Sequence, residues 1–175
     1  MGEFVIIGDL DGNGTDDLVI RVPGANSNRG GVYIFYSLSS VNNSILEATA
    51  VIEGEEPNGG LGRFLWMADL NGDGKEDLII GVPRANHNKG KIFIFYGRDM
   101  WGRIFPSFAD VTIEGKNEGD RVGQFLLTGD FNEDGKADLA VGVPTADSKD
   151  GEIYLFYGGE LRDTSISFES PAIQR

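Results

Sequence analysis

Short apolar runs rich in β-branched and aromatic residues recur along the chain, and glycine, proline or acidic residues bound each run. This pattern is typical of β-strands joined by tight turns. In the middle of the chain it predicts four strands, near residues 64–68, 77–82, 91–96 and 109–114. The first two runs are apolar at consecutive positions, so we expect both of their faces to be buried.

The same arrangement occurs three times, at intervals of 60 and 61 residues. An acidic loop leads each repeat and begins at Asp9, Asp69 or Asp130. A Val-Pro pair follows, ending at Pro23, Pro83 or Pro144, and then an aromatic run that ends at Tyr36, Tyr96 or Tyr157. Repetition at this period indicates stacked, equivalent structural units.

We therefore predict an all-β fold of β-propeller blades, each blade a four-stranded antiparallel sheet whose faces are covered by its neighbours. Residues 1–175 would form one propeller segment, either a partial propeller or part of an assembled one. The expected blades span about residues 1–57, 58–118 and 119–175.

The charge balance narrows the possible partners. There are 28 acidic and 15 basic residues, a net charge of −13, so we expect no binding to nucleic acid. Without cysteine, disulfides and thiolate chemistry are absent. No apolar stretch has the length of a membrane span, so we expect no membrane insertion, and the first residues do not resemble a signal peptide.

The acidic loops match a calcium-binding pattern. Oxygen ligands at positions 1, 3 and 5, a backbone carbonyl at 7 and a carboxylate at 9 can enclose one Ca²⁺, and glycine at 6 permits the sharp turn. The predicted ligands of three Ca²⁺ sites are Asp9, Asp11, Asn13, Thr15 and Asp17; Asp69, Asn71, Asp73, Lys75 and Asp77; and Asp130, Asn132, Asp134, Lys136 and Asp138.

Other interpretations of these loops are weaker. An EF-hand needs a glutamate at position 12, where this chain has Ile20, Ile80 and Val141. Mg²⁺ prefers fewer protein ligands, and turns of Asp, Asn and Gly also form without metal. Because the full pattern occurs in three aligned copies, calcium binding is the favoured interpretation.

These motifs resemble FG-GAP repeats, the blades of the integrin α-subunit propeller and its bacterial and archaeal relatives. Leu61-Gly62 and Val122-Gly123 stand at the FG position, and Gly-Val-Pro segments at the GAP position. The chain departs from the pattern at Arg21, where glycine is usual, and at Glu133, which replaces a loop glycine. Neither change removes a proposed ligand.

The resemblance implies a non-enzymatic module for protein recognition or cell adhesion, in an extracellular, cell-surface or periplasmic setting, with any targeting segment absent from this chain. Such propellers generally have seven blades, so three imply a fragment of a larger propeller, an open crescent or a homo-oligomer. The alternative is a carbohydrate-binding propeller, or a non-catalytic accessory domain of a secreted polysaccharide-acting enzyme.

A protein or glycan ligand would bind opposite the calcium loops, on the turns 24–30, 84–90 and 145–150 and the connections 54–62 and 115–123. Segment 97–109 carries Trp101 and other apolar residues, and we expect it to pack on its own blade. The sequence gives little reason to expect an enzyme. His87 is the single histidine, so a Ser/His pair would depend on it alone. Glu53 and Glu114 could serve as paired carboxylates, but they occupy equivalent repeat positions, which favours an architectural role.

Overall fold

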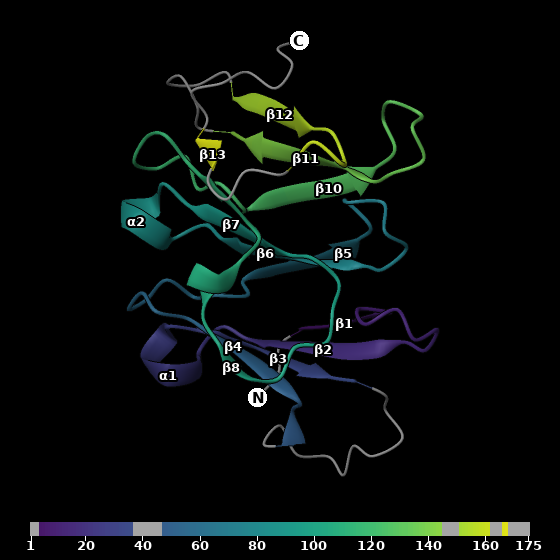
Figure 1. Cartoon of the computed structure of the whole chain (residues 1–175). Coiled ribbons are helices and arrows are strands. Elements are labelled where there is room, and N and C mark those ends of the chain that lie inside the picture. The colour runs from purple at the N-terminus through teal and green to yellow at the C-terminus, as the bar shows by residue number, and fades with distance from the viewer. Residues whose placement is uncertain (1–3, 37–46, 145–150, 162–165, 168–175) are drawn as a thin grey trace.

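A computed structural model describes residues 4–36, 47–144, 151–161 and 166–167, which form three stacked β-sheets (Figure 1). The main strands of the first sheet are β1 (Phe4–Gly8), β2 (Asp17–Val22), β3 (Gly31–Phe35) and β4 (Ala50–Glu53). Those of the second are β5 (Phe64–Ala68), β6 (Asp77–Val82), β7 (Lys91–Phe95) and β9 (Val111–Glu114). The third contains β10 (Phe125–Gly129), β11 (Asp138–Val143) and β12 (Glu152–Phe156).

Consecutive main strands pair antiparallel in each sheet, so the predicted all-β fold and the four strands of the second repeat are confirmed. In the third repeat, the counterpart of β9 would lie at residues 172–175, outside the described part of the chain. Two short turns, α1 (Ala25–Asn28) and α2 (Ala85–Asn88), connect the second and third strands of the first two sheets.

The hydrophobic core lies between the sheets. Ile34 and Ile52 of the first sheet belong to a buried cluster with Ile80 of the second, and Ile79 of the second belongs to another with Val141 of the third. Every residue of β6 is buried, as predicted. Two-sided burial is wrong for β5, because this edge strand leaves one face partly open, with Trp66 40% exposed.

Two additional strands link neighbouring repeats. β8 (Gly102–Ile104) pairs parallel with β4, and β13 (Ile166–Ser167) pairs parallel with β9. Segment 97–109 therefore adds a strand to the preceding blade, and the expectation that it packs on its own blade is wrong. The free edge of β4 offers unpaired backbone groups, which β8 satisfies before the chain turns at η3 (Pro106–Phe108) and enters β9.

Tyr36 anchors this crossing segment. Its hydroxyl donates to the carbonyl of Arg98 and accepts from the N–H of Met100, both at 2.9 Å. Burial raises the pKa of Tyr36 to about 12, so the hydroxyl stays protonated and able to donate. Met100 is 4% exposed within the core between the first two sheets.

Replacing this hydroxyl should loosen the crossing segment. We expect Tyr36→Phe to lower the free energy of unfolding by about 1–3 kcal/mol, because two hydrogen bonds are lost. Denaturant titration measures the change, and Tyr33→Phe on the same β-hairpin is the matched control. Equal stability of Tyr36→Phe and the parent chain would contradict the anchoring role.

Within the described residues, no helix has the length and apolar character needed to span a bilayer.

Candidate metal centre

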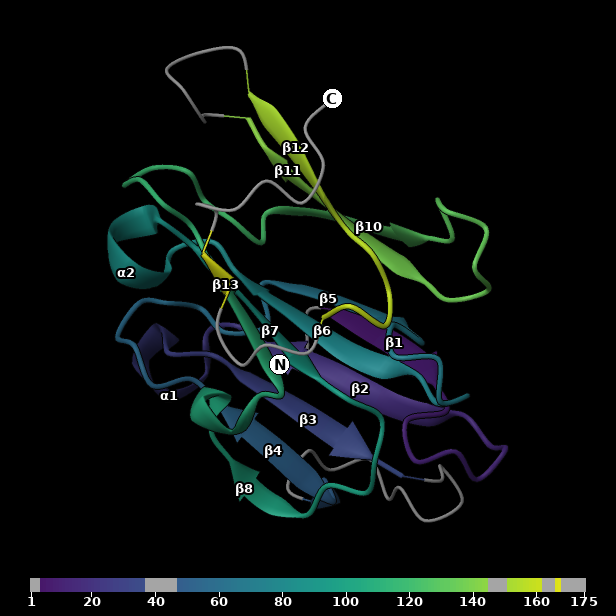
Figure 2. The same ribbon diagram turned by 45° about the horizontal axis from the view of Figure 1, so that its top comes forward.

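The three acidic loops lie together at one end of the sheets, opposite α1 and α2 (Figure 2). Loop 1 (residues 9–17) joins β1 to β2, loop 2 (69–77) joins β5 to β6, and loop 3 (130–138) joins β10 to β11. Backbone hydrogen bonds of 3.1 Å connect neighbouring loops, from Glu76 N to Asp9 O and from Ala137 N to Asp69 O. The prediction that the loops share one face is confirmed.

The aspartate at position 1 organises each loop. In loop 1, Asp9 Oδ1 accepts from the N–H groups of Gly12 and Asn13 at 2.8 and 3.0 Å, and Oδ2 accepts from Gly14 at 2.8 Å. Asp69 accepts all three corresponding bonds, and Asp130 accepts those from positions 5 and 6. Position 6 has φ of +84 to +87° in all three copies, a conformation that favours glycine.

Positions 3 and 5 carry side chains that curl back onto the loop. The Oδ1 atom at position 3 accepts from the N–H at position 5, and the Oδ1 atom at position 5 accepts from the N–H at position 7, at 2.8–3.0 Å in each loop. An asparagine amide also donates to the neighbouring carboxylate at 2.7–3.0 Å. Oxygen atoms of both positions are thereby fixed in orientation.

Thr15, Lys75 and Lys136 stand at position 7, where each donates its N–H to the side chain at position 5. Their carbonyls as metal ligands stay a prediction.

Position 9 has a structural role that the sequence analysis missed. Asp17, Asp77 and Asp138 are completely buried. Asp77 Oδ2 accepts from the N–H of Leu70 at 2.8 Å, and Oδ1 accepts from the N–H of Gly97, which follows β7, at 2.8 Å. Asp138 bonds the N–H groups of Phe131 and Gly158 at 2.8 Å in the same way. This aspartate therefore joins the loop to the end of the third strand.

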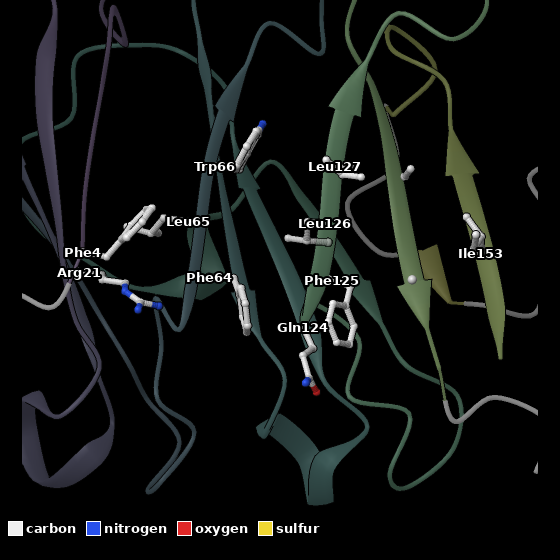
Figure 3. A pocket seen from close by; sticks show the side chains of 12 residues that line it. Phe4, Arg21, Phe64, Leu65, Trp66, Gln124, Phe125, Leu126, Leu127 and Ile153 are labelled. Atoms are coloured by element: carbon white, nitrogen blue, oxygen red, sulfur yellow. The ribbon is translucent and has the colours of Figure 1, made fainter. Parts of the chain in front are cut away.

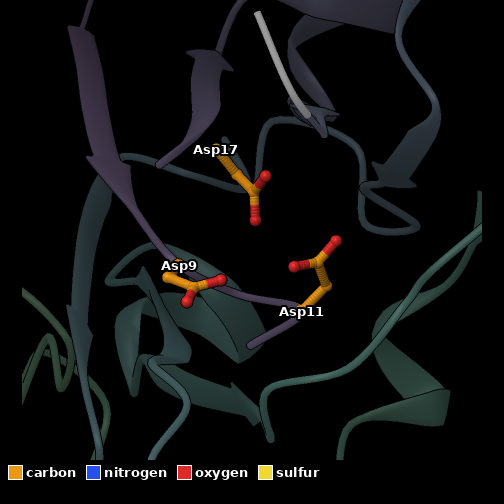
Figure 4. Close-up of side chains that lie close together, drawn as sticks. All are labelled: Asp9, Asp11 and Asp17. Atoms are coloured by element: carbon orange, nitrogen blue, oxygen red, sulfur yellow. The ribbon is translucent and has the colours of Figure 1, made fainter. Parts of the chain in front are cut away.

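Loop 1 brings its predicted ligands together. Carboxylate oxygens of Asp9, Asp11 and Asp17 lie within 4.8 Å of one another and face a common space (Figure 4). Calcium binds oxygen at 2.3–2.6 Å, so two ligands of one ion are at most about 5 Å apart. The separation and the hard oxygen donors fit this ion. In loops 2 and 3, asparagine replaces the carboxylate at position 3.

The local environment shifts the pKa values of three of the proposed ligand carboxyls. Burial raises the pKa of Asp77 to about 6, although three backbone N–H groups favour its ionised form. Burial also acts to raise the pKa of Asp9, but its hydrogen bonds outweigh this and hold the pKa below its ordinary value. The N–H of Lys136 and the amide of Asn132 lower the pKa of Asp134.

The opposite end of the sheets contains a pocket of about 220 Å³ between the first two blades. Its lining includes Glu56, Leu61, Lys91, Phe93 and Pro106. Lys91 Nζ lies 3.4 Å from Glu56 Oε1, and Glu56 Oε2 accepts from Asn86 N at 2.9 Å. Turns 24–30 and 84–90 lie at this end as predicted, and turn 145–150 is outside the described residues.

The residues considered for catalysis are separated in the fold. Glu53 on β4 forms an ion pair with Arg103 at 2.5 Å, and Glu114 on β9 accepts from the amide of Asn86. His87 is exposed in α2, with φ of +57°. The two glutamates thus belong to different sheets and each has a local partner.

Comparison with known families supports the repeat assignment. The FG-GAP repeat model matches residues 67–95 and 122–156, and the FG-GAP-like repeat model matches residues 9–80. Together the two models cover all three acidic loops.

Several curated proteins are similar to the chain. Rat phosphatidylinositol-glycan-specific phospholipase D is 36% identical over 63% of this chain and 15% of its own length. The mouse protein of the same name is 31% identical over 93% of this chain and 21% of its own length. Integrin alpha pat-2 of Caenorhabditis briggsae is 27% identical over 91% of this chain and 14% of its own length.

The chain therefore spans only 14–21% of the length of these relatives. The matched repeats, the three antiparallel sheets and the similarity to integrin α chains agree. The chain belongs to the FG-GAP repeat family, as an integrin-like β-propeller segment.

Proposed function

We propose that the chain is a calcium-binding, non-catalytic recognition module in which each acidic loop holds one Ca²⁺. The observation that carries this proposal is the convergence of the loop 1 carboxylates within 4.8 Å, on a hydrogen-bond pattern shared by all three loops. Side chains at positions 1, 3, 5 and 9 and the carbonyl at position 7 would hold the ion. The amide-to-carboxylate bond between positions 3 and 5 would give way to it.

Bound calcium would stabilise the folded chain. Three divalent ions offset six of the thirteen net negative charges, which reduces the repulsion that opposes compaction. Because Asp9 O and Asp69 O bond the following loop, an ordered loop also supports the contact with the next blade. Binding to the folded chain alone stabilises it by RT ln(1 + [L]/Kd) for each site.

Recognition would use the opposite end, where the turns and the 220 Å³ pocket lie. Relatives named as integrin alpha chains support a role in adhesion or protein recognition. Sites of this composition bind calcium modestly, so we propose a setting outside the cytosol, where calcium is plentiful.

A second candidate is a glycan-binding, non-catalytic accessory module of a larger enzyme whose other domains carry out the reaction. The similarity to phosphatidylinositol-glycan-specific phospholipase D favours it, because the matched region is a small part of that protein. Calorimetric titration with a glycan panel distinguishes the two candidates. Saturable heat that a pocket substitution such as Phe93→Ala abolishes would support glycan binding.

Loss of one ligand should remove one calcium site. Asp11 is partly exposed, and its carboxylate accepts hydrogen bonds within its own loop, from the N–H and the amide of Asn13. We therefore expect Asp11→Ala to fold normally and to bind two ions in place of three. Isothermal calorimetry measures the number of sites. Asp99→Ala, an exposed aspartate outside the loops, is the control and should retain three. Unchanged stoichiometry in Asp11→Ala would contradict the assignment.

A further inference from the structure

The two outer faces of the three-sheet stack expose apolar side chains. We call the outer side of the first sheet, with Val5 and Ile7, the leading face, and the outer side of the third, with Phe125, Leu127 and Ile153, the trailing face. Val5 and Ile7 are 50% and 60% exposed, and the three trailing residues are 51%, 63% and 75% exposed. A hollow of about 520 Å³ continues onto the trailing face (Figure 3).

Several exposed positions of these faces have buried counterparts elsewhere in the same chain. Ile92, the counterpart of Ile153, is 0% exposed because the third sheet covers it, and Leu65, the counterpart of Val5, is 5% exposed beneath the first sheet. Leu70 is 0% exposed, whereas its counterpart Phe131 is 53% exposed. The trailing face thus has the surface that normally receives another blade, and the leading face has the surface that normally covers one.

The acidic loops also present a backbone acceptor on the trailing face and a backbone donor on the leading face. Glu76 N donates to Asp9 O in one internal interface, and Ala137 N donates to Asp69 O in the next. The equivalent acceptor on the trailing side is Asp130 O. Among the described residues no backbone N–H bonds this carbonyl, and the equivalent leading-side donor, the N–H of Asp16, has no backbone acceptor either.

The residue at loop position 4 also lies against the side chain at position 7 of the next loop, so the sizes of the two residues must be compatible. A Cβ atom added to Gly12 would lie 2.9 Å from Cε of Lys75, and one added to Gly72 would lie 2.8 Å from Cε of Lys136. A glutamate at position 4 would therefore require the lysine side chain to move from this place. The trailing side has Glu133 at this position, and the leading side offers the short Thr15 at position 7.

Gly8 and Glu76 form a second pair of side-chain positions that fit each other across the interface between the first two sheets. The Glu76 carboxylate fills the space beside Gly8, where an added Cβ would lie only 1.6 Å from Oε2. The equivalent positions between the second and third sheets carry Ala68 and Ala137. The acidic Asp16 of the leading side corresponds to Glu76, and the trailing side supplies Gly129 in place of Gly8. Glycine again stands opposite an acidic side chain.

We propose that the trailing face of one chain binds the leading face of a second copy, head to tail, and so repeats the internal blade interface. Such a contact is heterologous, and it closes a ring when the rotation between copies permits. It covers the apolar side chains of both faces, whose burial stabilises association. The inference does not depend on calcium binding.

The experiment uses one substitution on each face of the 175-residue chain. Ile153→Asp alters the trailing face and Val5→Asp the leading face; each should weaken self-association at least about hundredfold, because the contact would bury an unpaired charge. Sedimentation equilibrium at about 0.15 M salt, which screens the net negative charge, measures the dissociation constant. An equimolar mixture of the two variants keeps one intact interface and should form a 1:1 dimer.

Phe108→Asp is the matched control, since Phe108 is 67% exposed but lies in η3, outside the strands that form the two faces, and it should associate like the parent chain. Circular dichroism melts confirm that the variants fold. A parent chain that stays monomeric at high micromolar concentration would overturn the proposal. So would a mixture of the two variants that stays monomeric. A variant of either face that associates normally would also overturn it, because an interface between two copies of the other face would give that result.

Discussion

Asp77→Ala should lower the free energy of unfolding by about 3–5 kcal/mol even when calcium is chelated, because it leaves buried backbone donors without an acceptor. Asp77 is fully buried and accepts from Leu70, Asn71 and Gly97 at 2.8–3.2 Å. Its removal disconnects loop 2 from the end of β7. Denaturant titration in the presence of chelator measures the change without the contribution of the metal.

Asp73→Ala is the control for this prediction. Asp73 stands in the same loop and is a proposed ligand, but it is exposed, so its removal should cost less than about 1 kcal/mol in chelator. A comparable loss for Asp73→Ala and Asp77→Ala would show that position 9 has no special structural role.

Removal of calcium should destabilise the parent chain strongly. At a free calcium concentration about 10–100 times Kd, each site adds about 1.4–2.7 kcal/mol, so three sites add about 4–8 kcal/mol. We expect chelation to lower the melting temperature by about 10–30 °C, and excess calcium to restore it. Differential scanning calorimetry with and without chelator measures the shift.

The triple variant Asp11→Ala, Asp73→Ala, Asp134→Ala provides the matched control. It lacks one ligand in every loop and should melt at nearly the same temperature with and without calcium. If the parent chain is equally insensitive, the loops are ordinary turns. If the triple variant keeps the full shift, calcium stabilises the chain at other positions.

The main strands could be predicted because local sequence determines them. Apolar runs such as residues 77–82, and turns that require glycine, recur at a constant interval, so each repeat supports the interpretation of the others. The crossing strand β8 could not be predicted in this way. Gly102–Ile104 has no strong strand pattern, and its pairing with β4 depends on an exposed edge some 50 residues earlier in the chain, an edge that only the fold reveals.

The candidate site was predictable to a similar extent. Alternating oxygen donors and the glycine at position 6 indicate the loop conformation, and the hydrogen bonds of Asp9 and Asp11 agree with it. The structural role of Asp77 was missed, because its partner Gly97 lies 20 residues away after another strand. The glycine that follows the second and third aromatic runs, Gly97 and Gly158, was the available signal.

A crystal structure determined with millimolar calcium tests the central claim most directly. Anomalous scattering should locate one ion in each acidic loop, with oxygen ligands from positions 1, 3, 5, 7 and 9 at about 2.3–2.6 Å. Loops without ions, or ions bound only at other places on the chain, would contradict the account.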